Sequence, residues 1–270
     1  MKGKHRVKQS KNINIKIIII VIMVIVLILS ASYLVYHFYN EWKNKADMQE
    51  LSNAVDEAII NDNVEGNTEN IELLSELQEL KKENTDLIGW LKIEGTNINY
   101  PVLQKENDND YYVNHNFQKE VSELGSIFLD KDCSVENPTD NLLIYGHRNT
   151  GGQMFETLTN YKEESFYTKH PTFQFATLDE VSEYQIIAVF QSQVYLKSQN
   201  VFKYYFFKDA KNEEEFDEYI ENVKKLSMYR IEETANYGDQ LITLSTCDYH
   251  TEDGRFAVVA KKINKNYNNN

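Results

Sequence analysis

The sequence predicts a mostly β domain that carries N-terminal helices and follows one membrane-spanning helix. Three observations lead to this fold class. A long apolar stretch follows a basic N-terminus. From Gly89 onward, short apolar segments alternate with turn residues, which is typical of strands. One long amphipathic helix, beginning near Asn212, interrupts these strands before the C-terminal part of the chain.

The first 40 residues predict a membrane anchor. They contain six Lys or Arg residues and no acidic residue, and an apolar stretch runs from Ile17 to Leu29 and continues to Tyr39. This length spans a bilayer, and the basic end is expected inside. We therefore expect a cytoplasmic basic tail at 1–16 and a single transmembrane signal anchor at 17–39, with the rest of the chain outside the cell.

A cleaved signal peptide is the alternative, because Ser30-Ala31-Ser32 resembles a cleavage site with small residues. Tyr33, Tyr36, Phe38, Tyr39 and Trp42 favour the uncleaved anchor, since aromatic side chains are enriched at the membrane interface.

Without the six basic residues of this segment, 22 of the 28 remain against 42 acidic residues, a net charge of −20. Nucleic-acid binding needs a basic surface and is therefore not expected.

The segment 40–69 is expected to form a juxtamembrane helix and a hinge. Met48, Leu51, Val55, Ala58 and Ile59 recur at helical spacing within 41–60, and the polar run 61–70 contains Gly66. A second amphipathic helix follows, with Thr68 or Asn70 as its N-cap. Its predicted apolar stripe consists of Ile71, Leu74, Leu77 and Leu80.

Short strands follow from Gly89, with turn signals at 94–95, 107–109 and 137–138. The helix that begins at Asn212 has Glu215 three residues later as a start signal, and its apolar stripe consists of Phe216, Ile220, Val223 and Leu226. The runs 141–146, 240–246 and 256–260 predict three further strands. We expect one domain over 70–265 and a disordered tail at 266–270.

Two C-terminal strands bring a thiol and a guanidinium together. Asp253-Gly254 marks the turn between 240–246 and 256–260, so a hairpin would place Cys247 and Arg255 face to face. A cysteine nucleophile needs a proton acceptor and a group that stabilises negative charge on the attacked carbonyl. Arg255 suits the second role, and His147, which ends the strand 141–146, suits the first.

Each of these residues also has an ordinary structural interpretation. A cysteine in a strand is commonly a small buried hydrophobe, a histidine after glycine a loop residue, and an arginine at a strand end a solvated charge. In an exported protein Cys133 and Cys247 could also form a disulfide. The six histidines do not cluster with Cys or acidic residues at ligand spacing, so no metal or other cofactor is expected.

The joint pattern resembles the sortases, the cell-wall transpeptidases of Gram-positive bacteria. The resemblance is carried by Tyr145-Gly146-His147, Thr243-Leu244-Ser245-Thr246-Cys247 and Gly254-Arg255, in this order. The resemblance covers roughly residues 70–263. Within this range it points to the class B sortases, which the runs 89–96, 99–104, 125–130 and 258–261 resemble. The resemblance implies a closed, mostly antiparallel eight-stranded β-barrel, and the long helix before the cysteine strand is the mark of class B.

The resemblance also implies a mechanism. Cys247 would attack the threonine carbonyl of a C-terminal sorting motif on an exported protein, giving a thioacyl enzyme. His147 would protonate the leaving amine and deprotonate the amine of a peptidoglycan precursor, lipid II or its cross-bridge, while Arg255 holds the oxyanion or the substrate backbone. Thr246 and Ser245, which flank the nucleophile, and Asn109 and Val113, by the class B pattern, would contact substrate.

Several alternatives remain open at this point. His250 is a rival base to His147, Asp248 is an acidic neighbour of the nucleophile, and Tyr145 is expected to pack. At the level of function, the alternatives are a pilin-polymerising sortase and a membrane-tethered binding module without enzymatic activity. The first should carry an N-terminal lid with an Asp-Pro-aromatic motif, which the sequence lacks, since Pro occurs only at 101, 138 and 171.

Overall fold

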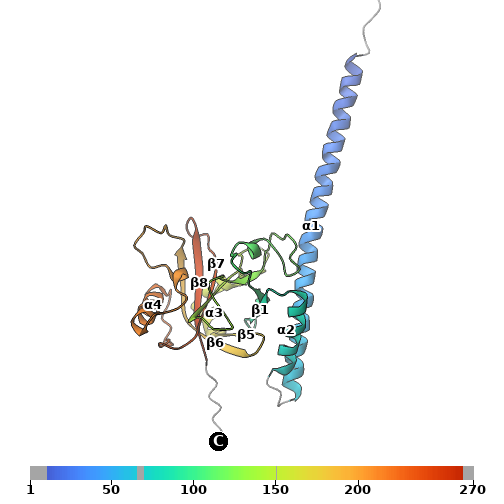
Figure 1. The fold of residues 1–270 in the computed structure, drawn as a ribbon. Coiled ribbons are helices and arrows are strands. Elements are labelled where there is room, and N and C mark those ends of the chain that lie inside the picture. The colour runs from blue at the N-terminus through green and yellow to red at the C-terminus, as the bar shows by residue number, and fades with distance from the viewer. Residues whose placement is uncertain (1–10, 66–69, 150, 264–270) are drawn as a thin grey trace, which may run out of the picture. The chain divides into compact units, whose positions relative to one another are not determined.

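The structure is a computed structural model that describes residues 11–65, 70–149 and 151–263. Its helices are α1 (Lys11–Glu65), α2 (Ile71–Glu83), α3 (Glu164–Lys169) and α4 (Glu213–Leu226) (Figure 1). Its strands are β1 (Leu87–Lys92), β2 (Asn99–Leu103), β3 (Ile127–Leu129), β4 (Asn141–Tyr145), β5 (Thr172–Ala176), β6 (Val181–Gln193), β7 (Leu241–Cys247) and β8 (Gly254–Lys262). Three 3₁₀ turns join them: η1 (Tyr111–Val113), η2 (Thr157–Lys162) and η3 (Tyr204–Phe206).

The eight strands of the described residues close into a barrel in the order β1-β2-β3-β4-β7-β8-β6-β5, with β5 paired to β1. This confirms the predicted closed barrel. The pairs β2–β3 and β4–β7 are parallel, and the other pairs are antiparallel. Because parallel strands end at the same edge, the C-terminal ends of β4 and β7 lie side by side at one rim.

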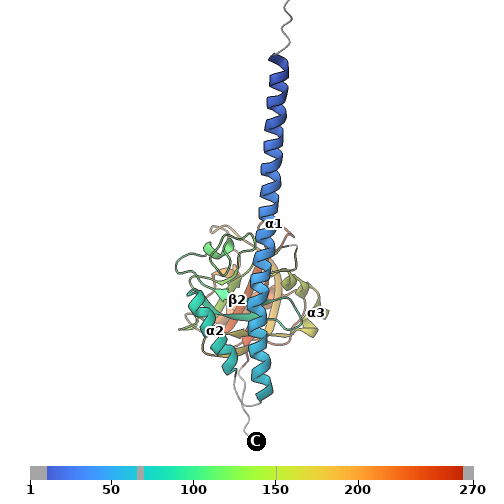
Figure 2. The same ribbon diagram turned by 90° about the vertical axis from the view of Figure 1, so that its right-hand side faces the viewer.

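Apolar side chains fill the barrel. Strand β7 is buried along its length until its last residue, and the main apolar core includes Leu143, Ile144, Leu244 and Val258, all without exposed surface. A second apolar cluster lies between the outside of the barrel and the helices. There Val55 of α1 and Leu77 of α2 pack with residues such as Trp90, so burial of apolar surface holds these helices in place. Figures 1 and 2 show α2 alongside the C-terminal part of α1.

Polar contacts reinforce the packing of α1 on the barrel. Asp56 accepts a hydrogen bond from Lys92 at 2.8 Å, and Ser52 accepts one from Asn99 at 2.6 Å. Asn99 in turn accepts a 2.6 Å bond from the indole of Trp90. The polar side chains of α1 therefore contribute to its position on β1 and β2, as its apolar side chains do.

The N-terminal part of α1, up to Ala46, forms a compact unit of its own. Its apolar side chains are exposed, and within the described residues α1 alone is long and apolar enough to cross a membrane. Its apolar span begins at Ile15 and includes the predicted anchor at 17–39. The exposed side chains agree with a segment that uses lipid as its solvent.

One predicted helix boundary, the end of the juxtamembrane helix, is wrong. Helix α1 continues to Glu65, so residues 61–65 of the hinge predicted at 61–70 are helical. The polar run 61–65 holds no Gly or Pro, and polarity alone does not end a helix. Residues 66–69, including the proposed cap Thr68, lie outside the described residues, as does the tail at 266–270.

In α2 the buried residues are Leu73, Leu77 and Leu80, whereas Ile71 is 58% exposed. The core-facing stripe follows i, i+4 and i+7 from Leu73, and Ile71 in the first turn lies off this face. Asn70 occupies the cap position with a left-handed backbone and makes no side-chain capping bond. In α4, by contrast, Asn212 caps the helix by accepting the Glu215 amide at 3.0 Å.

The predicted stripe of α4 is confirmed except at its end. Phe216, Ile220 and Val223 are buried together with Tyr219. Leu226, the last residue of the helix, is 42% exposed.

Candidate active site

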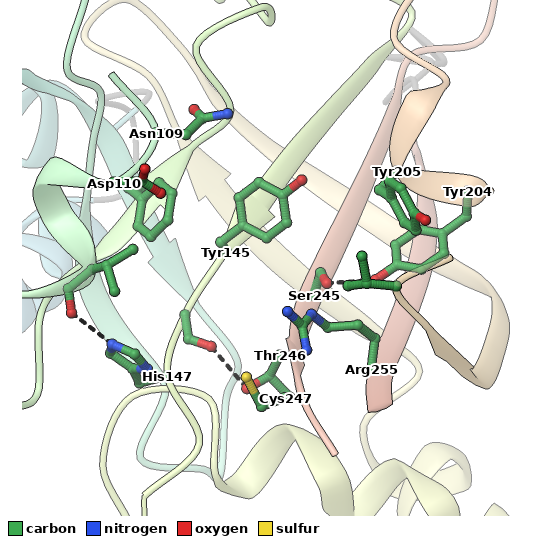
Figure 3. A pocket seen from close by; sticks show the side chains of 14 residues that line it. Asn109, Asp110, Tyr145, His147, Tyr204, Tyr205, Ser245, Thr246, Cys247 and Arg255 are labelled. Carbon is green, nitrogen blue, oxygen red and sulfur yellow. Dashed lines mark hydrogen bonds between the residues drawn. The ribbon is translucent and has the colours of Figure 1, made fainter. Parts of the chain in front are cut away.

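A pocket of about 340 Å³ opens at the rim where β4 and β7 end. All seven residues singled out in the sequence line it (Figure 3): Cys247, His147, Arg255, Thr246, Ser245, Asn109 and Val113. Further lining residues are Asp110, Phe128, Tyr145, Gly146, Val194, Tyr204 and Tyr205. The fold therefore brings together side chains from opposite ends of the domain sequence.

Cys247 is the last residue of β7 and lies directly opposite Arg255 of β8, which confirms the predicted hairpin. The amide of Asp248 donates to the carbonyl of Gly254 at 2.9 Å. Since hydrogen-bonded and non-hydrogen-bonded pairs alternate, Cys247 and Arg255 form a non-hydrogen-bonded pair, whose Cα atoms are about 4.5 Å apart. Gly254 is needed in this turn, because a Cβ atom there would lie 2.1 Å from the Asp248 carbonyl oxygen.

Among the partners that the described residues offer, the guanidinium of Arg255 bonds only to backbone carbonyls. Its Nη1 atom donates to the carbonyl of Gly254 at 3.0 Å and to that of Asp253 at 3.4 Å. Among the described residues no carboxylate pairs with it, and the group lies in the pocket (Figure 3). Its positive charge is therefore available to an anionic group that develops next to Cys247.

His147 follows β4 and is held by its backbone and its ring. Its carbonyl accepts from the Phe155 amide at 2.9 Å, and its Nε2 atom lies 2.6 Å from the carbonyl oxygen of Val113. A carbonyl only accepts, so Nε2 carries a hydrogen in this arrangement and Nδ1 is left for proton transfer. No hydrogen bond joins the Cys247 thiol to this ring among the described residues.

The glycine before His147 is required by packing. A Cβ atom on Gly146 would lie 2.4 Å from the Ile127 side chain and 2.7 Å from the Phe155 ring. Two buried apolar side chains thus approach Gly146 closely. They support the backbone that carries His147.

The hydroxyls of the two residues before Cys247 are already engaged. Thr246 donates to the carbonyl of Gly146 at 2.8 Å, and Ser245 shares a 2.7 Å hydrogen bond with the hydroxyl of Tyr204. Burial raises the pKa of Tyr204 to about 12, although the Ser245 bond and the nearby charge of Arg255 act in the opposite direction. Direct hydrogen bonding of these hydroxyls to substrate stays a prediction, and it would require them to change partners.

Asn109 and Val113 belong to the segment that forms the opposite wall of the pocket. The side-chain oxygen of Asn109 accepts from the Lys131 amide at 2.6 Å, which leaves its amide nitrogen as a donor. Val113 contributes its side chain to the lining and its carbonyl to His147. The sequence indicated both residues only through the family pattern, and the contact of the Val113 carbonyl with His147 had no sequence signal.

Asp248 lies behind the pocket and has four side-chain partners. It is bonded to Arg148 at 2.7 Å, Lys162 at 2.8 Å, Gln191 at 2.6 Å and His250 at 2.9 Å, and its side chain is 1% exposed. Burial by itself would raise the pKa of Asp248, but the bonds from Lys162, Gln191 and His250 and the charge of Lys162 together lower it below its ordinary value. The sequence did not indicate this cluster, because its members come from distant segments.

The alternative base and the alternative disulfide are both disfavoured. His250 is held by Asp248 and is not part of the pocket lining. Cys133 and Cys247 are free thiols, so the disulfide is contradicted. Cys133 is buried and donates to the carbonyl of Asn141 at 3.3 Å, and burial raises the pKa of its thiol to about 11.

Tyr145 packs against Phe128, as expected, and its hydroxyl also donates to Asp130 at 3.2 Å. Burial, together with the charge of Asp130, raises the pKa of Tyr145 strongly. Its ring lines the pocket. Tyr145 is therefore a neutral, fixed part of the pocket wall.

Comparisons with known proteins agree with this geometry. A family model described as the sortase domain matches residues 91–263. The chain is 36% identical over 198 residues to sortase B of Listeria monocytogenes, covering 73% of this chain and 77% of that protein. It is 33% identical over 190 residues to sortase B of Staphylococcus aureus, covering 70% and 75%. The structure of a Staphylococcus aureus sortase B-substrate complex matches with a TM-score of 0.72 and 27% identity, over 84% of this chain and 99% of that one.

Proposed function

Because this chain belongs to the sortase family and is a class B cysteine transpeptidase, we propose that Cys247 is its nucleophile, His147 its acid and base, and Arg255 its oxyanion-binding cation. The pairing of Cys247 with Arg255 across the ladder carries this proposal. The parallel pairing of β4 with β7 supports it, since His147 follows one of these strands and Cys247 ends the other.

The first half-reaction forms a thioacyl enzyme. The thiolate of Cys247 attacks the threonine carbonyl of a sorting motif, and the carbonyl electrons move to the oxygen, whose negative charge Arg255 stabilises. Collapse of this intermediate breaks the C–N bond, and the protonated imidazole of His147 gives its proton to the leaving amine. The released segment departs, and the protein substrate remains bound to Cys247 as a thioester.

The second half-reaction transfers the acyl group. An acceptor amine attacks the thioester carbonyl, neutral His147 takes up the proton of the attacking amine, and the Cys247 thiolate leaves. The product is a new amide bond, and the thiolate and imidazolium are regenerated. The hydrogen bond between Nε2 and Val113 supports Nδ1 as the atom that exchanges the proton.

The finer assignment of partners and location is also part of this proposal. The donor is a surface protein that carries a sorting motif, and the acceptor is the amine of a peptidoglycan precursor, lipid II or its cross-bridge. Residues 17–39 anchor the chain as a single membrane span with the basic tail 1–16 in the cytoplasm and the domain 70–265 outside. Ser245, Thr246, Asn109 and Val113 are the proposed substrate contacts.

The test uses the full chain in detergent micelles with a library of sorting-motif peptides, with and without a small amine, followed by mass spectrometry. We expect an acyl adduct on Cys247 and an amine-linked peptide product. Cys247→Ala should abolish both, while Cys133→Ala, the matched control at the second cysteine, should retain them. An adduct that forms in Cys247→Ala, or no amine-linked product with any peptide, would contradict the proposal.

A further inference from the structure

The residues before and after Cys247 form side-chain hydrogen bonds and an ion pair with the residues before and after His147. The regular pairing of β4 with β7 ends at Tyr145 and Ser245. One step further, the Thr246 hydroxyl donates to the Gly146 carbonyl at 2.8 Å (Figure 3). Beyond the proposed base and nucleophile, the guanidinium of Arg148 bonds to the carboxylate of Asp248 at 2.7 Å. Each catalytic candidate therefore lies between two links that join the same two segments.

No backbone ladder joins these segments at the level of the catalytic candidates. His147 pairs with Phe155 of its own loop, and Cys247 pairs with Arg255 of β8. The last backbone bond between the two segments is that of the Gly146 amide to the Ser245 carbonyl at 3.2 Å, and beyond it the relative position of His147 and Cys247 depends on side-chain links. A further contact supports the outer link, since the Arg148 guanidinium lies over the Tyr249 ring at 5.0 Å. This cation–π contact restricts the guanidinium further.

The outer link is buried at its acidic end. The Asp248 side chain is 1% exposed and that of Arg148 25% exposed. An ion pair in such surroundings is screened little by solvent and keeps its geometry, unlike a pair on the open surface. The Asp248 amide also donates to Gly254, which fixes the backbone that carries the carboxylate.

We propose that Arg148 and Asp248 are positioning residues, which form a clamp that holds the imidazole of His147 and the thiol of Cys247 in register for proton transfer. The clamp rests on the proposed roles of these two groups. Neither positioning residue lines the pocket. A misplacement of about 1 Å in a reacting group lowers a rate by about 100-fold, so loss of the clamp should act on the chemical step and not on substrate binding.

Lys162 offers a matched control. It bonds to the same Asp248 oxygen as Arg148 does, at 2.8 Å and with 29% exposure of its side chain. It comes from η2, however, and has no direct connection to His147 along the chain. Removing either cation takes one positive partner from Asp248, but of the two only the Arg148 side chain links the two catalytic segments. The bond of the Tyr249 hydroxyl to the Arg148 carbonyl at 3.3 Å is available in both variants.

The experiment compares Arg148→Met, Arg148→Lys and Lys162→Met in the full chain in detergent micelles. It measures kcat and KM for amine transfer, the thermal midpoint, and the rate at which iodoacetamide alkylates Cys247. We expect Arg148→Met to lower kcat at least about 10-fold with KM changed by less than about 2-fold, and Arg148→Lys to recover most of this loss. Lys162→Met should keep kcat within about 3-fold while it lowers the thermal midpoint as much as Arg148→Met does.

Equal losses of kcat in Arg148→Met and Lys162→Met would overturn the proposal, as would a change confined to KM. Arg148→Met leaves Asp248 three of its partners, so the fold is expected to survive, and Arg148→Lys provides a second, milder variant. The alkylation rate needs no substrate. If the wild-type chain shows no transfer, the proposed function fails. The alkylation rate then still tests the clamp: slower alkylation of Cys247 in Arg148→Met than in Lys162→Met would support it, and equal rates would contradict it.

Discussion

The hydrogen bond between Tyr204 and Ser245 allows a direct test of whether Ser245 serves the fold or the substrate. Both hydroxyls are buried, with 1% of each residue exposed, and they are 2.7 Å apart. The perturbation is a double-mutant cycle of Tyr204→Phe and Ser245→Ala. Each single substitution removes one hydroxyl and leaves the other buried without its partner.

The expected magnitude follows from that geometry. A buried hydroxyl without a partner costs about 1–3 kcal/mol, whereas removal of both partners of a hydrogen bond leaves no unpaired hydroxyl and costs no more than removal of one. Each single variant should therefore lose about 2 kcal/mol of unfolding free energy, and the double variant about the same, not about 4 kcal/mol. The coupling energy is then about 2 kcal/mol, or roughly a 30-fold effect on the unfolding equilibrium.

The assay is urea unfolding of the full chain in detergent micelles, followed by tryptophan fluorescence. Trp90 is 2% exposed in the core and reports unfolding of the barrel, whereas Trp42 is 67% exposed on α1 and gives a background. Additive losses in the double variant would refute the reasoning. If Ser245→Ala instead keeps full stability and raises KM, the hydroxyl serves the substrate and not the fold.

Three further predictions follow from the same contacts. Gly146→Ala should lower stability by about 1–3 kcal/mol and reduce kcat, because its Cβ atom would clash with Ile127 and Phe155; a variant with wild-type unfolding and activity would contradict this. Burial would raise the pKa of Asp86, but the Tyr112, Lys119 and Lys105 bonds lower it below 3.8. The stability from Asp86 is therefore present above that value and lost as pH falls through the lowered pKa. The thermal midpoints of wild type and Asp86→Asn should thus converge as the pH falls below 3.8, and a constant difference would count against it. Cys133 should react with iodoacetamide far more slowly than Cys247 at neutral pH, because burial raises its pKa to about 11; peptide mapping that finds equal labelling would disprove this.

The hairpin of β7 and β8 was predictable because its signals are local. Two apolar runs flank Asp253-Gly254, and the backbone of Asp253 adopts the left-handed conformation that such a turn requires, with φ of 51°. The register that sets Cys247 against Arg255 follows from the length of this loop. The family resemblance added the closed barrel, which does not follow from local periodicity. It also supported the choice of His147, which its place at a strand end had already suggested.

The environment of the site was not predictable in the same way. Lys162 precedes Asp248 by 86 residues and Val113 precedes His147 by 34, and nothing in either segment marks the contact. The sequence also predicted that Ser245 and Thr246 lie beside the pocket. It did not predict the hydrogen-bond partner of the Ser245 hydroxyl, because Tyr204 comes from a 3₁₀ turn 41 residues away. Such contacts depend on the tertiary fold and leave no periodic pattern in the local sequence.

A comparison of the two cysteines explains why the candidate nucleophile lies at the end of a strand. Cys133 is enclosed in the core, where burial raises the pKa of its thiol to about 11 and no substrate can reach it. The six residues of β7 before Cys247 are buried, although Ser245 and Thr246 also line the pocket, and Cys247 is the first residue of the strand that is partly exposed. One residue earlier, at Thr246, the position is only 3% exposed. One residue later, at Asp248, it would lie behind the pocket among charged side chains. The final rung of β7 therefore combines a rigid backbone with access to substrate, and this combination is what a covalent mechanism requires.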